Sequence, residues 1–248
     1  MKVKSILVSQ PEPQTAKSPY FELAEKNGLK IDFRPFIQVE GVPAKEFRQT
    51  RIQILEHSAV IFTSRTAIDH YFRIAQELRL TIPDTMKYFC ISEATAFYLQ
   101  KYIVYRKRKI FYADGKFSDL TSLMKKHSGE KFLVPLSDIH KQEIPQLLDQ
   151  GGYKYTKAIL YRTVSADLSD LAEIKYDILV FFSPSGIKSL FQNFPDFVQD
   201  STRIACFGPS TAKAVRDAGL RLDIEAPTAQ APSMTMALEQ YIKKVNKN

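Results

Sequence analysis

Short hydrophobic runs recur along the chain, and many of them end at a turn of small polar residues. The clearest example is 178–186 (ILVFFSPSG), where an apolar run typical of a strand buried on both faces stops at a Ser-Pro-Ser-Gly turn. Apolar residues at helical spacing follow, and 204–211 (IACFGPST) repeats the run and the turn before a second helix over 212–218. Gly219 stands where the glycine that ends a helix is usually found.

This double unit has an earlier counterpart in the chain. Three pairs of segments correspond in the same order: 61–68 (IFTSRTAI) with 180–187 (VFFSPSGI), 90–96 (CISEATA) with 206–212 (CFGPSTA) and, less closely, 112–114 with 225–228. Three matches in one order indicate an internal duplication, and therefore two similar α/β domains.

The other elements also alternate between strand and helix. Predicted strands cover 3–9, 30–36, 59–62, 86–91, 109–113, 131–135 and 157–164, and predicted helices cover 19–27, 46–56, 94–102, 118–127, 139–150 and 233–244. This alternation is typical of parallel sheets with helices on both faces. We therefore expect an α/β fold with two parallel-sheet domains of the flavodoxin-like kind.

The first strand-helix-strand unit has no partner directly after it, so its natural place is the sheet of the last repeat. The chain would then start in one domain, build the other and return. We expect a discontinuous first domain of 1–36 and 167–248, and an inserted second domain of 44–157. The segments 37–43 and 158–166 would be the two linker strands.

Four predicted strands lead through a polar turn into a helix, at 63–65, 92–95, 183–186 and 208–211. Backbone N–H groups, hydroxyls and the positive end of a helix dipole meet at such turns and favour an anion. N-capping by Ser or Thr explains each turn taken singly. Four of them at strand ends, where ligands of parallel sheets bind, favour a ligand with several carboxylates or phosphates.

Composition agrees with a folded protein that binds an anion. The chain has 248 residues, and 44% of them are hydrophobic, which excludes a disordered chain. Its net charge of +8 suits an anionic partner: nucleic acid, a membrane surface or a polyanionic small molecule. Simple solubility explains the charge equally well. The basic segment 101–109 (KYIVYRKRK) could bind single-stranded nucleic acid through Tyr102 and Tyr105, but a solvated strand edge is the favoured interpretation.

Other classes of site find little support. No apolar run is long enough for a membrane span or a signal peptide, so we expect a cytoplasmic protein without membrane contact. Cys90 and Cys206 lie in predicted buried strands and are expected to be free thiols rather than a disulfide or a catalytic nucleophile. The histidines show no metal-ligand spacing, and no phosphate-binding glycine loop is present: His57, His70, His127 and His140.

Tyr161 lies on the strand expected to leave the inserted domain. A tyrosine there that faces the cleft could donate a proton or a hydrogen bond. A half-buried aromatic on a strand, a place that tyrosine favours, explains it equally well.

Together these motifs resemble the uroporphyrinogen-III synthase family. The matching segments, in the order and spacing of that family, are FTSRTAI (62–68), SEATA (92–96), LYRTV (160–164), FFSPSG (181–186), FGPSTAKAV (207–215) with Gly219, and EAPT (225–228). The resemblance implies two α/β domains joined by a two-stranded linker. It also implies a cofactor-free lyase of haem biosynthesis that cyclises hydroxymethylbilane, a linear tetrapyrrole with eight carboxylates, to uroporphyrinogen III. Water is lost, and the terminal ring is inverted through a spiro intermediate.

The resemblance also implies roles for individual residues in a cleft between the domains. Tyr161 would act as a general acid on the departing hydroxyl, and Thr95 would hydrogen-bond the substrate. Eight further residues would bind side-chain carboxylates or line the cleft: Ser64, Arg65, Thr66, Ser183, Ser185, Gly186, Ser210 and Thr211. No cofactor, metal or nucleic acid is implied; we expect a monomer that receives its small-molecule substrate from hydroxymethylbilane synthase.

The chain departs from the family pattern in two turns. Glycine is usual where Ser92 stands, and Glu93 puts a carboxylate at a helix start that would receive carboxylates. The first strand usually ends in Thr-Arg-Pro, whereas 9–11 reads Ser-Gln-Pro and lacks the cation. A non-catalytic two-domain protein that binds a tetrapyrrole or another polyanion is therefore the alternative.

Overall fold

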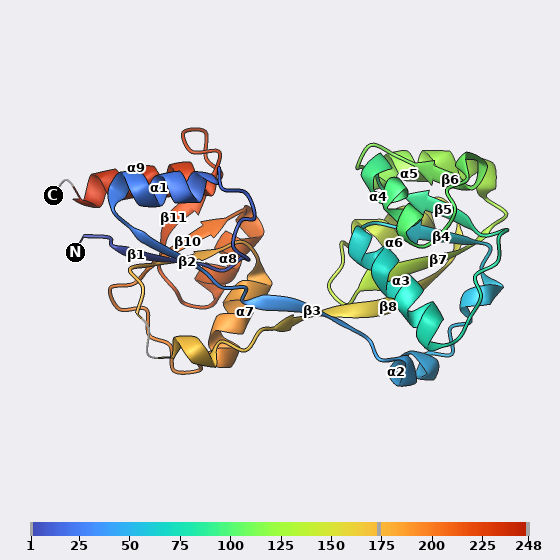
Figure 1. Ribbon diagram of the computed structural model, residues 1–248, viewed down its shortest axis with the longest axis horizontal. Coiled ribbons are helices and arrows are strands. Elements are labelled where there is room, and N and C mark those ends of the chain that lie inside the picture. The colour runs from blue at the N-terminus through green and yellow to red at the C-terminus, as the bar shows by residue number, and fades with distance from the viewer. Residues whose placement is uncertain (1, 173–174, 247–248) are drawn as a thin grey trace. The chain divides into compact units, whose positions relative to one another are not determined.

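The computed structural model describes residues 2–172 and 175–246, and its chain divides into two compact units (Figure 1). Unit 1 comprises Met1–Gln38 and Val164–Asn248, and unit 2 comprises Val39–Thr163. The chain therefore begins in unit 1, builds unit 2 and returns to unit 1.

Unit 1 is a five-stranded sheet with helices on both faces. Its elements are β1 (Ser5–Val8), α1 (Pro19–Asn27), β2 (Lys30–Phe33), β9 (Ile178–Phe181), α7 (Pro184–Asn193), β10 (Arg203–Phe207), α8 (Pro209–Asp217), β11 (Leu222–Ala226) and α9 (Met234–Asn246). The strand order is β2-β1-β9-β10-β11, with every pair parallel. This is the strand order of the flavodoxin-like fold.

The central strand β9 is apolar at every position because helices cover both of its faces. Ile178 and Val180 pack in the core under α1 and α9, whereas Leu179 and Phe181 pack in the core under α7 and α8. Successive side chains of a strand point to opposite faces, so a strand covered on both faces has no polar position.

Unit 2 is a second α/β sheet, of six strands in the order β3-β8-β7-β4-β5-β6. Its elements are β3 (Ile37–Gly41), α2 (Ala44–Gln49), β4 (Ala59–Phe62), α3 (Arg65–Glu77), β5 (Lys87–Cys90), α4 (Glu93–Tyr98), β6 (Ile110–Tyr112), α5 (Phe117–Met124), β7 (Lys131–Ser137), α6 (Glu143–Gln150) and β8 (Lys154–Ser165). Helices α2, α3 and α4 share one core with Val60 and Phe62, and α5 and α6 share the opposite core with Ala59 and Ile61.

The two sheets correspond strand by strand. Read from one edge, β8-β7-β4-β5-β6 of unit 2 matches β2-β1-β9-β10-β11 of unit 1. The segments that match in sequence occupy matching positions, since 61–68 leaves β4 and 180–187 leaves β9. The expected α/β class with two similar parallel sheets is confirmed.

The strands β3 and β8 form the antiparallel ribbon that joins the units. The Val42 N–H donates to the Leu160 carbonyl at 2.9 Å, and the Ala166 N–H donates to the Phe36 carbonyl at 2.9 Å. Because the numbering rises along one strand as it falls along the other, the pair is antiparallel, unlike the other strand pairs of the two sheets.

Two predicted helices were wrong in extent, and one strand was missed. The helix expected over 46–56 breaks after α2, because Arg51 has a left-handed φ of 58° and the Thr50 hydroxyl donates to the Phe47 carbonyl at 2.7 Å. The helix expected over 139–150 begins only at Glu143, and the Ile139 N–H instead donates to the Ser137 hydroxyl and the Asp138 carboxylate. β11 was not predicted as a strand.

Candidate functional site

A cavity of about 430 Å³ opens at the carboxyl edge of the sheet of unit 2. Its walls come from the segments after β4, β5, β6 and β7, with Tyr161 of β8. The strand order reverses between β4 and β7, because β5 follows β4 on one side and β8 follows β7 on the other. Ligands of open parallel sheets bind at this kind of switch point, so the cavity lies where the topology predicts a site.

Tyr161 is a buried wall of this cavity. β8 pairs with β7 so that Tyr161 lies opposite Ser137, the last residue of β7. Its hydroxyl lies 3.4 Å from the Ser64 hydroxyl. Burial raises the pKa of Tyr161 above its ordinary value, and the hydrogen bond with Ser64 offsets only part of that rise. At neutral pH the phenol therefore keeps its proton and can donate a hydrogen bond.

The ring of Tyr161 is held from behind by His70 of α3. The two rings stack with centroids 5.0 Å apart and planes inclined by 15°. Arg73 donates from Nε to His70 Nδ1 at 3.1 Å, so the other imidazole nitrogen carries the proton. Burial first, and then the charge of Arg73, lowers the pKa of His70, so the imidazole is neutral at pH 7.

The turn after β7 adds a second imidazole to the cavity. His140 Nδ1 lies 2.9 Å from the Ser137 carbonyl, and its Nε2 is buried without a hydrogen-bond partner within the described ranges. Asp138 fixes this turn to β8: its N–H donates to the Tyr161 carbonyl at 3.2 Å, and its carboxylate accepts from the Thr163 N–H at 3.0 Å.

Charged side chains stand at the rim of the same cavity. Lys116 precedes α5, Lys141 precedes α6, and all three of Lys116, Lys141 and Glu143 are exposed. Two cations and one carboxylate give this rim a net positive charge, which favours an anionic ligand.

The predicted residues after β4 begin helix α3. The Ser64 hydroxyl caps the helix by accepting from the Ala67 N–H at 3.0 Å, while it also meets Tyr161. Arg65 is exposed, and its guanidinium lies 5.5 Å from the centre of the Tyr98 ring. Thr66 is half-buried in the first turn. The Ser64 hydroxyl therefore caps the helix and contacts Tyr161 at the same time.

Thr95 lies in the first turn of α4, the helix that follows the neighbouring strand β5. It is buried, and its hydroxyl lies 3.0 Å from the Ser92 hydroxyl, which also accepts from the Thr95 N–H at 3.3 Å. Glu93 is exposed at the first position of α4, where it accepts a hydrogen bond from the Tyr112 hydroxyl at 3.0 Å. Ser92 thus supplies a cap that a glycine would not.

The corresponding turns of unit 1 hold the other five predicted residues. Ser183 caps α7 by accepting from the Gly186 N–H at 3.2 Å, and a Cβ on Gly186 would come within 3.2 Å of Phe181. Ser185 is half-buried there. After β10, Ser210 is exposed and Thr211 is buried in the first turn of α8.

The structure brings some of the predicted residues together and separates others. Ser64 and Tyr161 share the cavity and face each other. Thr95 belongs to the same sheet edge but does not line the cavity, and the described residues show no hydrogen bond between it and Tyr161. The five residues of unit 1 occupy the matching edge of the other sheet.

The remaining candidates do not form a site. Cys90 and Cys206 are buried thiols, and burial raises their pKa to about 12 and about 11, so neither is a thiolate at neutral pH. Over residues 2–172 and 175–246, no group of His, Cys, Asp and Glu is arranged to hold a metal ion. In the same residues no helix is long and apolar enough to cross a membrane.

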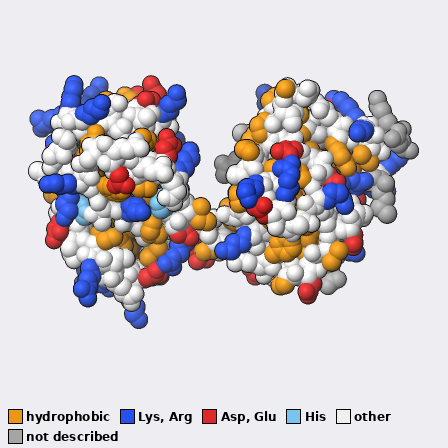
Figure 2. Space-filling model, turned by 180° about the vertical axis from the view of Figure 1, so that it is seen from behind, with side chains coloured by type: hydrophobic (Ala, Val, Ile, Leu, Met, Phe, Trp, Pro, Cys, Tyr) orange, Lys and Arg blue, Asp and Glu red, His pale blue; other side chains and the backbone are white. Residues whose placement is uncertain are grey.

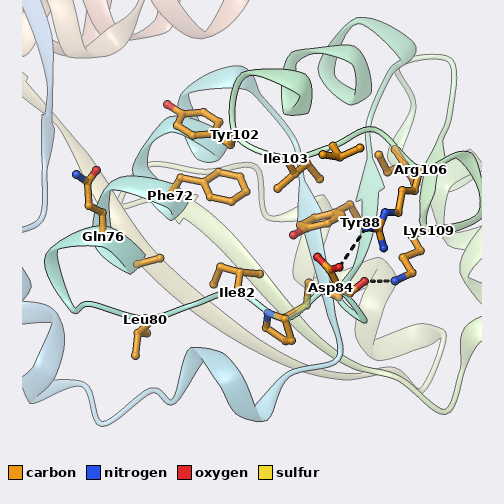
Figure 3. A pocket seen from close by; sticks show the side chains of 15 residues that line it. Phe72, Gln76, Leu80, Ile82, Asp84, Tyr88, Tyr102, Ile103, Arg106 and Lys109 are labelled. Carbon is orange, nitrogen blue, oxygen red and sulfur yellow. Dashed lines mark hydrogen bonds and ion pairs between the residues drawn. The ribbon is translucent and has the colours of Figure 1, made fainter.

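The basic segment 101–109 packs against the body of unit 2 beside a second cavity, of about 540 Å³ (Figure 3). Tyr102 stacks on Phe72 with centroids 4.4 Å apart, and Arg106 pairs with Asp84 at 3.1 Å. Lys101 pairs with Asp69 at 2.9 Å. On the face shown in Figure 2, basic and acidic side chains are interspersed over both units. Stacking inside the unit leaves Tyr102 unavailable to stack on bases, which disfavours the nucleic-acid interpretation.

Comparison with known proteins assigns the chain to a family. The family model described as Uroporphyrinogen-III synthase HemD matches residues 18–236. The chain belongs to the uroporphyrinogen-III synthase family. A uroporphyrinogen-III synthase of Chlorobaculum parvum is 26% identical over 97% of this chain and 100% of its own length, and that of Saccharomyces cerevisiae is 28% identical over 52% of each chain.

Solved structures of the family share the fold. The crystal structure of uroporphyrinogen-III synthetase from Helicobacter pylori is 18% identical, covers 97% of this chain and 99% of its own, and superposes with a TM-score of 0.60. A mutant uroporphyrinogen III synthase from Thermus thermophilus gives a TM-score of 0.52 at 16% identity, over 99% of this chain and 100% of its own. At these identities the likeness establishes the architecture alone.

Sequence reasoning missed several residues of the candidate site in this family member, among them His70, Arg73 and His140. His70 and Arg73 lie inside an amphipathic helix, where nothing in the pattern separates them from ordinary surface positions. The sequence did contain a signal for His140, because 138–140 follows β7 as 9–12 follows β1, and both segments lie directly after strand ends. Applying the strand-end criterion to all strands would have included it.

Proposed function

We propose that this chain cyclises and dehydrates hydroxymethylbilane to uroporphyrinogen III, with inversion of the terminal ring, as a lyase of tetrapyrrole biosynthesis. The family match over residues 18–236 carries the proposal. The cavity at the switch point supports it, since Tyr161 of the family's outgoing-strand motif opens into this cavity beside Ser64.

The charge of the chain suits this substrate. The bilane carries eight carboxylates, the chain has a net charge of +8, and Lys116 and Lys141 stand at the rim of the cavity. Turns at the starts of α3, α4, α7 and α8 offer backbone N–H groups and hydroxyls to further carboxylates. We assign this role to Ser64, Arg65, Thr66, Ser183, Ser185, Gly186, Ser210 and Thr211, and a hydrogen bond to the substrate to Thr95.

The first chemical step breaks the C–O bond of the hydroxymethyl group, and the oxygen leaves as water. Tyr161 would donate a hydrogen bond to that oxygen. Because burial raises its pKa, the phenol is a weak acid, and we assign it a helping role in departure. The larger contribution would be orientation: a bilane held folded closes through the spiro intermediate, whereas a free bilane closes directly.

A non-catalytic polyanion binder is the alternative, and Glu93 at a helix start is the feature that favours it. Turnover separates the two. The bilane is generated from porphobilinogen by hydroxymethylbilane synthase, and the chain is added at a concentration far below that of the bilane. A synthase accelerates the disappearance of all of the bilane. A binder leaves the rate at that of the protein-free blank, and this result would contradict the proposal.

A further inference from the structure

The imidazole of His140 has one nitrogen, Nδ1, in a hydrogen bond and the other, Nε2, without a partner among the described residues. The Ser137 carbonyl, 2.9 Å from Nδ1, can only accept a hydrogen bond, so Nδ1 carries a proton. In the neutral ring Nε2 then bears the lone pair, and in the charged ring Nε2 is a donor. This nitrogen is buried and has no partner among the described residues.

An unpaired buried nitrogen is costly unless it serves a ligand. Leaving such a group without a hydrogen bond costs about 1–3 kcal/mol, and folded proteins rarely keep one without a use. The turn that holds His140 is well anchored, since the Asp138 carboxylate accepts from the Ile139 N–H at 2.9 Å and from the Thr163 N–H at 3.0 Å. The imidazole is therefore preorganised in the wall that it shares with Tyr161.

The proposed function, on which this inference rests, needs a proton donor and then a proton acceptor. Departure of the hydroxyl as water consumes one proton, and restoration of the aromatic pyrrole after ring closure releases one from carbon. Tyr161 holds its proton tightly, because burial raises its pKa. An imidazole can perform both transfers near neutral pH, and His140 is the histidine that lines the cavity.

We propose that His140 is a catalytic acid and base of the ring closure, acting through Nε2. The imidazolium gives its Nε2 proton to the hydroxyl as the C–O bond breaks, which yields water and an azafulvenium cation. The terminal ring attacks the exocyclic carbon of this cation, and the spiro intermediate, which carries the positive charge, opens and recloses with that ring inverted. The neutral Nε2 then takes the proton that the pyrrole carbon loses. The bilane becomes uroporphyrinogen III and one water, and the imidazolium is restored.

Charged groups surround the imidazole. Lys116, Lys141 and Glu143 lie at the rim of the cavity, and the carboxylate of Asp138 lies in the same turn as His140. Bound substrate would add carboxylates to this set. The pH profile of kcat, which reports on the complex, is therefore the informative one.

The test compares His140→Gln with His127→Gln, the same change at a histidine of unit 2 outside the cavity. Glutamine keeps a hydrogen-bonding side chain but cannot titrate near neutral pH. We expect kcat for type III product to fall about hundredfold or more in His140→Gln, with KM changed by less than about threefold and the near-neutral limb of the kcat profile lost. His127→Gln should stay within about twofold of the parent, because it touches no part of the proposed proton path.

Chemical rescue adds a readout that a structural role would not give. In His140→Ala, added imidazole should restore at least about tenfold of the lost kcat, because it can occupy the vacated space. A kcat near that of the parent with an unchanged pH profile, a loss confined to KM, or no rescue would overturn the assignment of His140. If the parent chain itself forms no type III product, the proposed function fails instead, so the two failures are distinguishable.

Discussion

The imidazole of His70 stacks on the phenol of Tyr161, with ring centroids 5.0 Å apart and planes inclined by 15°. Arg73 fixes the imidazole by donating to its Nδ1 at 3.1 Å, and its guanidinium also donates to the carbonyls of Val42 at 2.9 Å and Leu160 at 3.2 Å. Helix α3 is thereby hydrogen-bonded to β8 and to the residue that follows β3. The position of the tyrosine ring follows from this set of contacts.

Removing only the hydroxyl of Tyr161 tests its chemical role. Tyr161→Phe keeps the stack on His70, so we expect KM to change little. We expect kcat to fall roughly ten- to hundredfold, which is at or below the lower end of the range for a lost acid, because Tyr161 only donates a hydrogen bond to the departing oxygen. Steady-state formation of type III product measures both constants. Ser64→Ala is the companion variant, since it removes the other end of the 3.4 Å contact and should have a smaller effect. A raised KM with unchanged kcat would assign Tyr161 to binding alone.

Arg73 should matter for stability more than its position on a helix suggests. Arg73→Met removes a charged donor from two backbone carbonyls and from His70, which should lower the free energy of unfolding by about 2–3 kcal/mol. Chemical denaturation measures the change. Arg48→Met is the control, because Arg48 is exposed on α2, and it should cost less than about 0.5 kcal/mol. Equal effects of the two variants would show that the hydrogen bonds of Arg73 do not stabilise the fold.

Gly41 gives an independent check of the same contact. A Cβ at this position would lie 2.7 Å from the Arg73 guanidinium, so Gly41→Ala should displace it. We therefore expect Gly41→Ala to be destabilising with Arg73 present and nearly neutral in the Arg73→Met background. A double-mutant cycle should give a coupling of about 1 kcal/mol. Additive effects would mean that the two residues do not interact.

Glu93 should weaken substrate binding. Its carboxylate stands at the first position of α4 and would repel a polycarboxylate, so Glu93→Gln should lower KM about two- to fivefold at low salt. The gain should shrink as salt is added, because screening removes the repulsion in the parent. Glu25→Gln, an exposed change on α1, should leave KM unaltered. A KM that stays the same or rises in Glu93→Gln would show that this turn does not meet substrate carboxylates.

Asp177 should make the fold sensitive to acid. Burial alone would raise the pKa of this carboxyl, but hydrogen bonds from the Lys4 and Ser5 N–H groups and the Ser5 hydroxyl outweigh it, so the folded-state pKa lies below the ordinary value. The stabilisation is therefore complete above the unfolded pKa near 4 and is lost as pH falls through the lower folded value.

The lowered pKa of Asp177 predicts how the variant Asp177→Asn responds to pH. It should be less stable than the parent by about 1–2 kcal/mol at neutral pH, and the gap should close as pH falls below about 4. Thermal denaturation at stepped pH measures the gap, with the exposed Asp196→Asn as the control. A gap that widens on acidification would reverse the assigned direction of the pKa.

Much of the fold could be predicted because covered strands leave a simple pattern. The runs at 59–62 and 178–181 are apolar at every position, since both faces of β4 and β9 are covered. β11 was not predicted as a strand because it lies at the sheet edge and carries Asp223 and Glu225 among its apolar residues. The early end of α2 was not predicted because Arg51 adopts a left-handed φ without the glycine that usually marks this conformation.

The site was harder to predict because tertiary contacts build it. Tyr161 and Ser64 could be selected, one by its motif and the other by its place at a strand end. Their 3.4 Å contact depends on the strand order, which places β8, β7 and β4 side by side. The roles of His70 and His140 depend on which atoms face which, and no local pattern encodes that.

The isomer composition of the product shows whether the chain has synthase activity. Hydroxymethylbilane is generated in place from porphobilinogen, the chain is added, and the uroporphyrins are oxidised and separated into types I and III. Without an enzyme the bilane closes to type I, so the blank defines the background. We predict predominantly type III, which requires both ring closure and inversion of the terminal ring. Type I alone, formed at the rate of the blank, would contradict the account and leave a synthase fold without synthase chemistry.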